Sequence, residues 1–339
     1  MSSNQNRSGM IEISEILGKE IAREEVITRL QDDYDTYRTF QAFPKEEQEK
    51  LLAFMQGQRG LPITYDTFFH KVMAPQEHPE RLESLLSALL GQEVHIAKVF
   101  PKEGVRMLDA GSFVIMDILL SLEDGSLMNV EMQKIGYAFS GERSCCYVSD
   151  MTMRQYNQLK SERGKHFQYR DMKPVFLIVL MENSSREFRE VAPYYLHRME
   201  VSYDSKAKVN SLFNIMYISL DTFRELSQNI ITKLEAWLTF LSSDEPDDIV
   251  RLVMNHPEFA EYYQDILEFR RSPKELVGMF SEALRMMDRN TERYMVNELQ
   301  KDVENLKSTV AEQADTIFEQ ADEIARLRAE LEKYKKSKV

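Results

Sequence analysis

Polar and apolar residues alternate along two neighbouring segments near the middle of the chain, and this period of two predicts β-strands. From 113 to 122 every even position is apolar; from 127 to 133 the even positions are again apolar, and the odd positions from 129 on are polar. Side chains of a strand alternate between the two faces of its sheet. Both strands are therefore expected to bury their even face, and Asp117, Glu131 and Gln133 share the other face.

The connection between the two strands decides whether these polar side chains meet. It contains Asp124-Gly125, which is a strong signal for a β-hairpin. A two-residue turn at this pair would place Asp117 opposite Met132, so that the two carboxylates would lie on opposite faces. We therefore expect a three-residue loop or a β-bulge, either of which restores the shared face.

Outside the hairpin the apolar spacing is mostly that of helices. Residues 57–62, which contain two glycines and a proline, interrupt a helical N-terminal segment and mark the start of the main domain. Helices are expected at 11–57 (with a separate helix at 46–55), 79–90, 143–160, 235–241, 246–253 and 273–287. Further strands are expected at 93–99, 174–182 and 213–218. The alternation of strands and helices predicts an α/β fold.

The last segment of the chain carries a heptad repeat. Apolar residues and two glutamines recur from 296 to 334 at alternating spacings of three and four, without glycine or proline among them. This pattern predicts a coiled coil, and β-branched residues at five of its six a positions favour a parallel homodimer. The alternative is a helix that folds back on the core. The predicted domains are an N-terminal helical segment (1–58), the main core (59–240), a helical extension (241–290) and the coiled coil (291–336).

Charge is distributed unevenly along the chain. The total is −13 and the isoelectric point is about 5.1, which argues against a general nucleic-acid coat protein. From 134 to 173, however, eight lysines and arginines stand against four acids, a local net charge of +4. Such a segment suits a polyanion, although a solvated helix face is the alternative. The candidate nucleic-acid contacts are Lys134, Arg143, Tyr147 and Arg154.

Other sequence features restrict the class of protein. The two cysteines, Cys145 and Cys146, are adjacent and cannot join distant segments, so we expect a reducing, cytoplasmic location. The longest apolar run, 175–181, is too short to span a membrane. Neither of the common glycine-rich phosphate loops is present, and the six histidines lack the spacing of zinc ligands.

Asp117 and Glu131 are the candidate metal ligands. Two carboxylates that face each other repel unless a cation lies between them, and oxygen ligands favour Mg²⁺ or Mn²⁺ over zinc. Such a site is typical of phosphodiester hydrolysis with metal assistance. The alternative is ordinary surface polarity on an edge hairpin. Glu80 and Glu83 could add a ligand, but solvent exposure is the expectation for both.

Five segments follow one another along the chain: 63–69, 79–82 with Leu85 and Leu86, the Asp117 strand, 129–133 and 143–156. In this order they resemble the recombination-promoting nuclease/putative transposase family, which belongs to the PD-(D/E)XK superfamily, and the resemblance covers roughly residues 60 to 290. It implies a restriction-endonuclease-like mixed-sheet core with helical flanks and the C-terminal coiled coil. It also implies a Mg²⁺-dependent DNA endonuclease associated with transposition or recombination.

The resemblance further implies individual roles. Asp117 would be the motif aspartate and Glu131 the second metal-binding acid; Gln133 takes the place of the motif lysine, and Met116 that of the proline. The shared strand face adds a separate hypothesis, in which the Met132 carbonyl is a further metal ligand and Gln133 orients the attacking water. Because glutamine offers a dipole where lysine offers a full charge, the alternative is an inactive nuclease-fold scaffold that binds DNA or protein.

Overall fold

The computed structural model describes residues 16–61, 63–100, 117–136, 139, 141–226 and 229–285, together with nine positions between 307 and 328. The chain divides into two compact units, Met1–Arg285 and Met286–Val339. The domain boundaries expected at 58 and 240 remain predictions, although one apolar cluster includes residues on both sides of each boundary.

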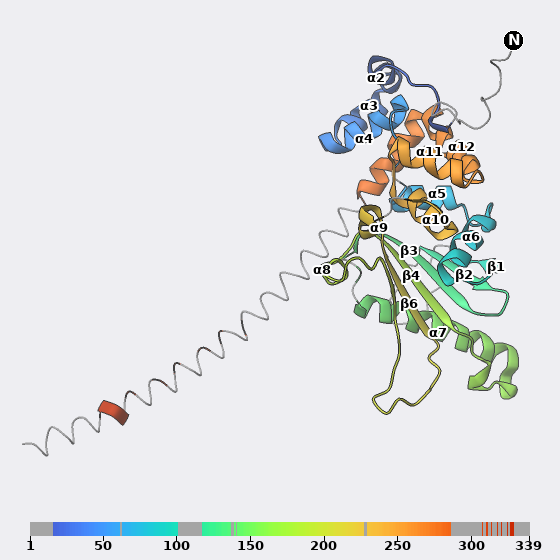
Figure 1. Cartoon of the computed structure of the whole chain (residues 1–339), viewed down its shortest axis with the longest axis vertical. Coiled ribbons are helices and arrows are strands. Elements are labelled where there is room, and N and C mark those ends of the chain that lie inside the picture. Colours follow the sequence, from blue (N-terminus) through green and yellow to red (C-terminus); the bar gives the residue numbers. More distant parts are fainter. Residues whose placement is uncertain are drawn as a thin grey trace, which may run out of the picture. The chain divides into compact units, whose positions relative to one another are not determined.

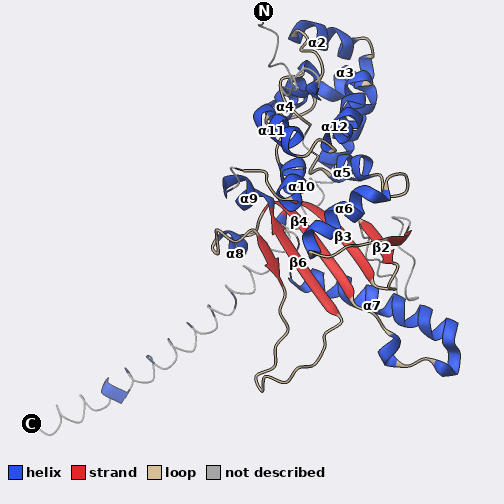
Figure 2. Cartoon of the chain, turned by 45° about the vertical axis from the view of Figure 1, so that its right-hand side comes forward, coloured by secondary structure: helices blue, strands red, loops and turns tan. Residues whose placement is uncertain are grey.

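A six-stranded mixed sheet forms the centre of the first unit (Figures 1 and 2). The strand order is β1-β2-β3-β4-β6-β5, with β3, β4 and β6 parallel and the other pairs antiparallel. The strands are β1 (Ile96–Val99), β2 (Ile118–Leu122), β3 (Leu127–Ile135), β4 (Val175–Asn183), β5 (Leu196–Arg198) and β6 (Phe213–Ser219). This arrangement agrees with the predicted restriction-endonuclease-like fold class.

Helices cover both faces of this sheet. The even-numbered side chains of β2 and β3 join one apolar cluster with α5 (Asp66–Met73), α6 (Pro79–Leu90) and α10 (Lys233–Ser242). On the other face, α7 (Gly141–Arg163) contributes Tyr147, Val148 and Met151 to a second cluster with odd-numbered strand residues. The expected strand parity is therefore confirmed, but the face that carries Glu131 is buried under α7.

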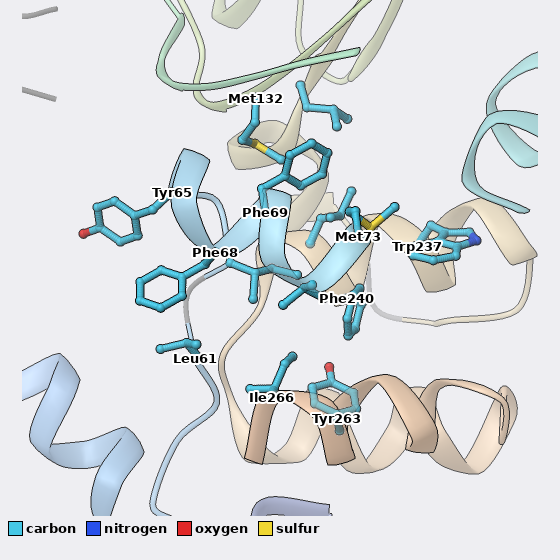
Figure 3. Packing of buried hydrophobic residues seen from close by; sticks show 14 of the residues in the cluster. Leu61, Tyr65, Phe68, Phe69, Met73, Met132, Trp237, Phe240, Tyr263 and Ile266 are labelled. Carbon is cyan, nitrogen blue, oxygen red and sulfur yellow. The ribbon is translucent and has the colours of Figure 1, made fainter. Parts of the chain in front are cut away.

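Helices from both ends of the first unit extend the core beyond the sheet. They are α2 (Arg23–Gln31), α3 (Tyr34–Gln41), α4 (Lys45–Gln56), α11 (Pro246–Asn255), α12 (Phe259–Glu268) and a helical segment at 273–285. Figure 3 shows Phe68, Phe69 and Met73 of α5 between Met132 of β3 and Ile266 of α12. Helix α5 therefore links the sheet to the outer helices.

Several of the expected elements need correction at their ends. β1 begins at Ile96 rather than 93, β4 reaches Asn183, and α7 runs from Gly141 to Arg163 rather than from 143 to 160. The expected helices at 79–90, 235–241 and 246–253 all correspond to observed ones. The pattern gave no indication of β5, because three residues are too few to show an alternation.

Smaller elements and the tail complete the description. Short helices α8 (Arg186–Arg189) and α9 (Leu220–Leu226) follow β4 and β6. No helix among the described residues is both long and apolar enough to cross a membrane. Most of the predicted coiled coil, like the start of the expected helix at 11–57, lies outside the described residues; the nine described positions of the tail are helical and exposed.

Candidate metal centre

The β2–β3 hairpin has the three-residue loop that the shared face requires. Ile118 pairs with Val130, and the pairing continues until the N–H of Leu122 donates to the carbonyl of Ser126 at 2.9 Å. The loop is therefore 123–125. Its last residue, Gly125, has a φ of 87°, a left-handed conformation that glycine adopts without strain. The predicted loop length is confirmed, and this register brings Asp117 opposite Glu131.

Two crossed hydrogen bonds join Asp117 to Glu131 and to the neighbouring Met132. The N–H of Asp117 donates to Oε1 of Glu131 at 3.0 Å, and the N–H of Met132 donates to Oδ2 of Asp117 at 3.1 Å. Nε2 of His70, on α5, lies 2.6 Å from the main-chain oxygen of Asp117. The start of β2 is therefore fixed from both sides, and the two carboxylates lie together beside β3.

The Glu131 carboxylate lies in the interior and is surrounded by polar groups. It is only 1% exposed and accepts hydrogen bonds from Nδ2 of Asn129 at 2.8 Å and Nε2 of Gln133 at 3.3 Å. Burial raises its pKa well above the ordinary value, and the negative charge of Asp117 raises it further. The bond from Asn129 and the positive charge of Arg143 act in the opposite direction.

This burial excludes surface polarity as the reason for the acidic pair. Asn129, Glu131 and Gln133 are 0%, 1% and 8% exposed, and they lie on the same face as the apolar Leu119 and Leu127. Burying a charged group is costly unless it is paired or coordinates a metal. A cation beside this pair would offset the charge of the two adjacent carboxylates, and the charge of Arg143 already acts in this direction.

Arg143 and Tyr147, on the first turns of α7, lie close to this pair. Nη2 of Arg143 donates to the hydroxyl of Tyr147 at 2.9 Å, and its guanidinium lies 4.4 Å from the ring centroid of Phe139. Burial raises the pKa of Tyr147, and the charges of Glu131 and Asp117 raise it further. These electrostatic effects show that α7 brings a guanidinium and a phenol to the acids.

The structure does not bring Lys134 and Arg154 to the same place. Nζ of Lys134 binds both carboxylate oxygens of Glu182, at 2.9 and 2.7 Å, and lies 3.7 Å from the ring centroid of Tyr65. Lys134 has even parity, so it projects from the opposite face of β3. Nε of Arg154 donates to Asp150 at 2.7 Å, one turn earlier on α7. Both cations are bound by carboxylates of the protein.

The donor atoms fit a hard divalent cation. Among the described residues no group of three or more His, Cys, Asp and Glu side chains could hold a metal ion, so the protein offers two carboxylates and neutral oxygens. Oδ1 of Asn129 is one such oxygen: it is buried and has no hydrogen-bond partner in the described part of the chain. Mg²⁺ is commonly bound by one or two carboxylates and keeps several waters.

Asn129 was not among the predicted site residues. The signal for it was its odd parity next to Glu131, which places it on the polar face. The two acids considered as extra ligands have other partners: Glu83 accepts the N–H of Ile96 at 2.7 Å, and Glu80 lies 3.0 Å from His78. These bonds do not connect Glu80 or Glu83 with the acidic pair.

Comparison with known proteins places the chain in a family. The PD-(D/E)XK nuclease family transposases match residues 63–294, which includes α5, the acidic hairpin, α7 and the rest of the sheet. This confirms the resemblance that the sequence motifs indicated. No curated protein and no solved structure is similar enough to count as a match.

Proposed function

Because the chain belongs to the PD-(D/E)XK nuclease family transposases, we propose that it is a Mg²⁺-dependent DNA endonuclease that acts in transposition or recombination. The observation that carries this proposal is the pair of crossed hydrogen bonds between Asp117 and the Glu131–Met132 segment. They hold two carboxylates together in a buried site, where their repulsion favours a bound cation.

Asp117, Glu131 and the Met132 carbonyl would hold the ion. The N–H and C=O of one strand residue point to the same edge of the strand. Since the N–H of Met132 points to Asp117, its carbonyl faces the same side. A divalent ion, Mg²⁺ or Mn²⁺, would make a water molecule more acidic and polarise the scissile phosphate.

The remaining side chains would orient the water and neutralise charge. Gln133 now donates to Glu131, and its amide is well placed to position a water molecule beside that carboxylate. Arg143 supplies the positive charge that Gln133 lacks, because its charge already acts on Glu131. A preorganised cation near a developing negative charge stabilises the transition state.

DNA contacts near the site would come first from Arg143 and Tyr147. Lys134 and Arg154 would have to leave Glu182 and Asp150 before they could bind a phosphate, so their contribution requires rearrangement. The tail would dimerise the protein. Its described apolar positions Val310, Ile317, Ile324 and Leu327 are 50–65% exposed and repeat at heptad spacing.

The free, exposed thiols of Cys145 and Cys146 support a reducing compartment, and we propose that the protein works in the cytoplasm. The second candidate function is a scaffold without catalysis. The observation that favours it is the neutral Gln133, whose amide is already bonded to Glu131. Such a scaffold would bind DNA through the same residues and would leave it intact.

Plasmid cleavage separates the two functions. Supercoiled DNA incubated with the purified protein should be nicked or linearised in Mg²⁺ and remain intact in EDTA. Asp117→Asn and Glu131→Gln should each lower the rate by at least about a hundredfold, because each removes a charge that binds the ion. Glu123→Gln, in the exposed hairpin loop, is the matched control and should cleave normally. Mg²⁺-dependent cleavage that survives both site substitutions would disprove the assignment.

A further inference from the structure

The C-terminal end of α7 forms a basic and aromatic projection, which we call the α7 tip. It comprises residues 156–173: the last turns of α7 and the two short 3₁₀ helices at Gly164–His166 and Tyr169–Asp171. Figures 1 and 2 show this end of α7 extending past the sheet. The tip lies at the opposite end of α7 from Arg143, and the proposed catalytic residues do not include it.

Three aromatic rings pack together at the tip. Tyr156 and Tyr169 are nearly parallel, with an interplanar angle of 15° and centroids 6.2 Å apart. Phe167 meets both rings edge to face, at 5.3 and 5.5 Å. Although Tyr169 makes these contacts, it is 76% exposed. The other two rings therefore hold one face of a tyrosine open to solvent.

The tip is strongly basic although the whole chain is acidic. It contains five cations, Lys160, Arg163, Lys165, Arg170 and Lys173, against the two acids Glu162 and Asp171, a net charge of +3. All five cations are exposed. Arg163 pairs with Asp171 at 3.0 Å, but no carboxylate in the described part of the chain pairs with Lys165, Arg170 or Lys173.

Hydrogen bonds fix the tip to the hairpin that carries the acidic pair. The buried amide of Gln155 accepts the N–H of Lys173 at 2.7 Å and donates to the carbonyl of Gly125 at 3.1 Å. Within the tip, Asp171 and Gln168 form reciprocal bonds of a capping box. The exposed ring and its cations are therefore held in a defined position relative to the proposed site.

We propose that the α7 tip binds an unpaired stretch of the DNA strand next to the bond that is cut. A base would stack on Tyr169, and phosphates would contact Lys165, Arg170 and Lys173. The proposal rests on the proposed function, since it places the substrate of that site. Bases in an intact duplex are stacked on each other and cannot reach a tyrosine ring, whereas an open aromatic face with surrounding cations is typical of single-strand binding.

Helix α7 sets the distance between the acidic pair and the α7 tip. Tyr147 lies near the acids, and Tyr156 follows nine residues later on the same helix, which corresponds to about 14 Å. Base pairs of a duplex are about 3.4 Å apart along each strand. The unpaired stretch would therefore begin about four nucleotides from the scissile phosphate.

Binding without cleavage tests this proposal. The full chain in EDTA is titrated into a dye-labelled oligonucleotide of about 16 nucleotides, the upper end of single-strand site sizes, and fluorescence anisotropy is measured. The same sequence is tested as a duplex. Tyr169→Ala should weaken single-strand binding about tenfold, the effect of losing one stacked base, and should leave duplex binding unchanged. Tyr34→Ala is the matched control, because Tyr34 is also 76% exposed and lies on α3.

The salt dependence tests the cations separately. Each phosphate contact in a single strand adds about 0.7 to the slope of log affinity against log salt, so Lys165→Ala/Arg170→Ala should lower the slope by about 1.4. Lys206→Ala/Lys208→Ala, in the exposed loop before β6, should leave the slope unchanged. Circular dichroism melting curves of all variants identify any loss that is due to unfolding.

Two outcomes would overturn the inference. One is that Tyr169→Ala binds single strands as tightly as Tyr34→Ala does. The other is that Tyr169→Ala weakens single-strand and duplex binding equally, which would make the tip a contact for duplex backbone. If the wild-type protein binds single strands through the tip in EDTA but never cleaves DNA in Mg²⁺, the nuclease assignment is disproved and the inference about the tip stands.

Discussion

The two residues of the acidic pair differ in exposure. Glu131 is almost wholly buried, whereas Asp117, directly before β2, is partly exposed. The parity of the sequence predicts that they share a face, because parity follows from strand geometry alone. It cannot predict that α7 covers this face, since that depends on packing between distant segments. The role of Asn129 depends on the same burial.

Gln133→Lys tests whether the neutral side chain limits the rate. Gln133 is 8% exposed and lies 3.3 Å from Oε2 of Glu131, so a lysine there would bring a full charge to the site. We expect cleavage to rise about tenfold, which corresponds to about 1.4 kcal/mol of transition-state stabilisation. Initial rates on plasmid DNA at saturating Mg²⁺ give the measurement. An unchanged rate would mean that the charge of Arg143 is sufficient by itself, and Arg143→Gln should then abolish cleavage.

Elements whose pattern is local were predicted closely, and elements defined by distant contacts were not. α6 begins at Pro79 and ends at Leu90, directly before Gly91, and both ends agree with the prediction. The hairpin loop follows from the need to keep two polar positions on one face. β5 exists only because three residues pair with β6, and α12 is held by aromatic contacts with α10 that no sequence period reveals.

The hairpin loop should depend on the backbone freedom of Gly125. Its φ of 87° is unfavourable for any residue with a side chain, so Gly125→Ala should lower the free energy of unfolding by about 1–2 kcal/mol. Gly141→Ala is the control: an added Cβ at this first residue of α7 would meet no atom within 4 Å. Urea unfolding curves of the two variants provide the comparison. Equal stabilities would contradict the left-handed loop.

Helix α3 should show an acid-dependent cap. The Asp33 carboxylate accepts the N–H of Thr36 at 2.9 Å and binds Lys274 at 3.1 Å, and these contacts lower its pKa from 3.8 to about 2. A lowered pKa in the folded state contributes stability above pH 3.8, and this contribution is lost as the pH falls toward 2.

Asp33→Asn should therefore remove part of the fall in melting temperature across that pH interval, because asparagine can cap a helix but does not titrate. Asp35→Asn, on the exposed side of the same helix, should melt like the wild type at each pH. Melting temperatures at several pH values measure the difference. A wild-type curve parallel to that of Asp33→Asn would show that the cap does not titrate.

At the scale of the whole molecule, the α7 tip and the complete chain have net charges of opposite sign. The chain carries −13 in total, but the α7 tip carries +3. A polyanion would therefore be repelled by the net charge of the chain and attracted to the tip, which favours a defined orientation on DNA. Net charge alone predicts weak nucleic-acid binding and does not reveal the tip.

The tail should control the number of chains in solution. Val310 and Ile317 occupy a positions of the heptad repeat and are 62% and 65% exposed in the single chain. Val310→Asp/Ile317→Asp should convert a dimer to a monomer, because a carboxylate at the seam of a coiled coil is buried without a partner. Light scattering after gel filtration gives the mass. Arg326→Ala, at an outer heptad position, should remain dimeric; equal masses for both variants would contradict the dimer.

The match to the family begins at residue 63, but the folded core begins earlier. Phe43 packs against Phe280 with ring centroids 5.4 Å apart, and Arg270 donates to the carbonyl of Met55 at 2.8 Å. A recombinant fragment trimmed to the matched limits would uncover Phe280 and leave the guanidinium without acceptors. Such a fragment should be insoluble on expression, so a shortened version for crystallisation has to retain the helices before residue 63 that carry Phe43 and Met55.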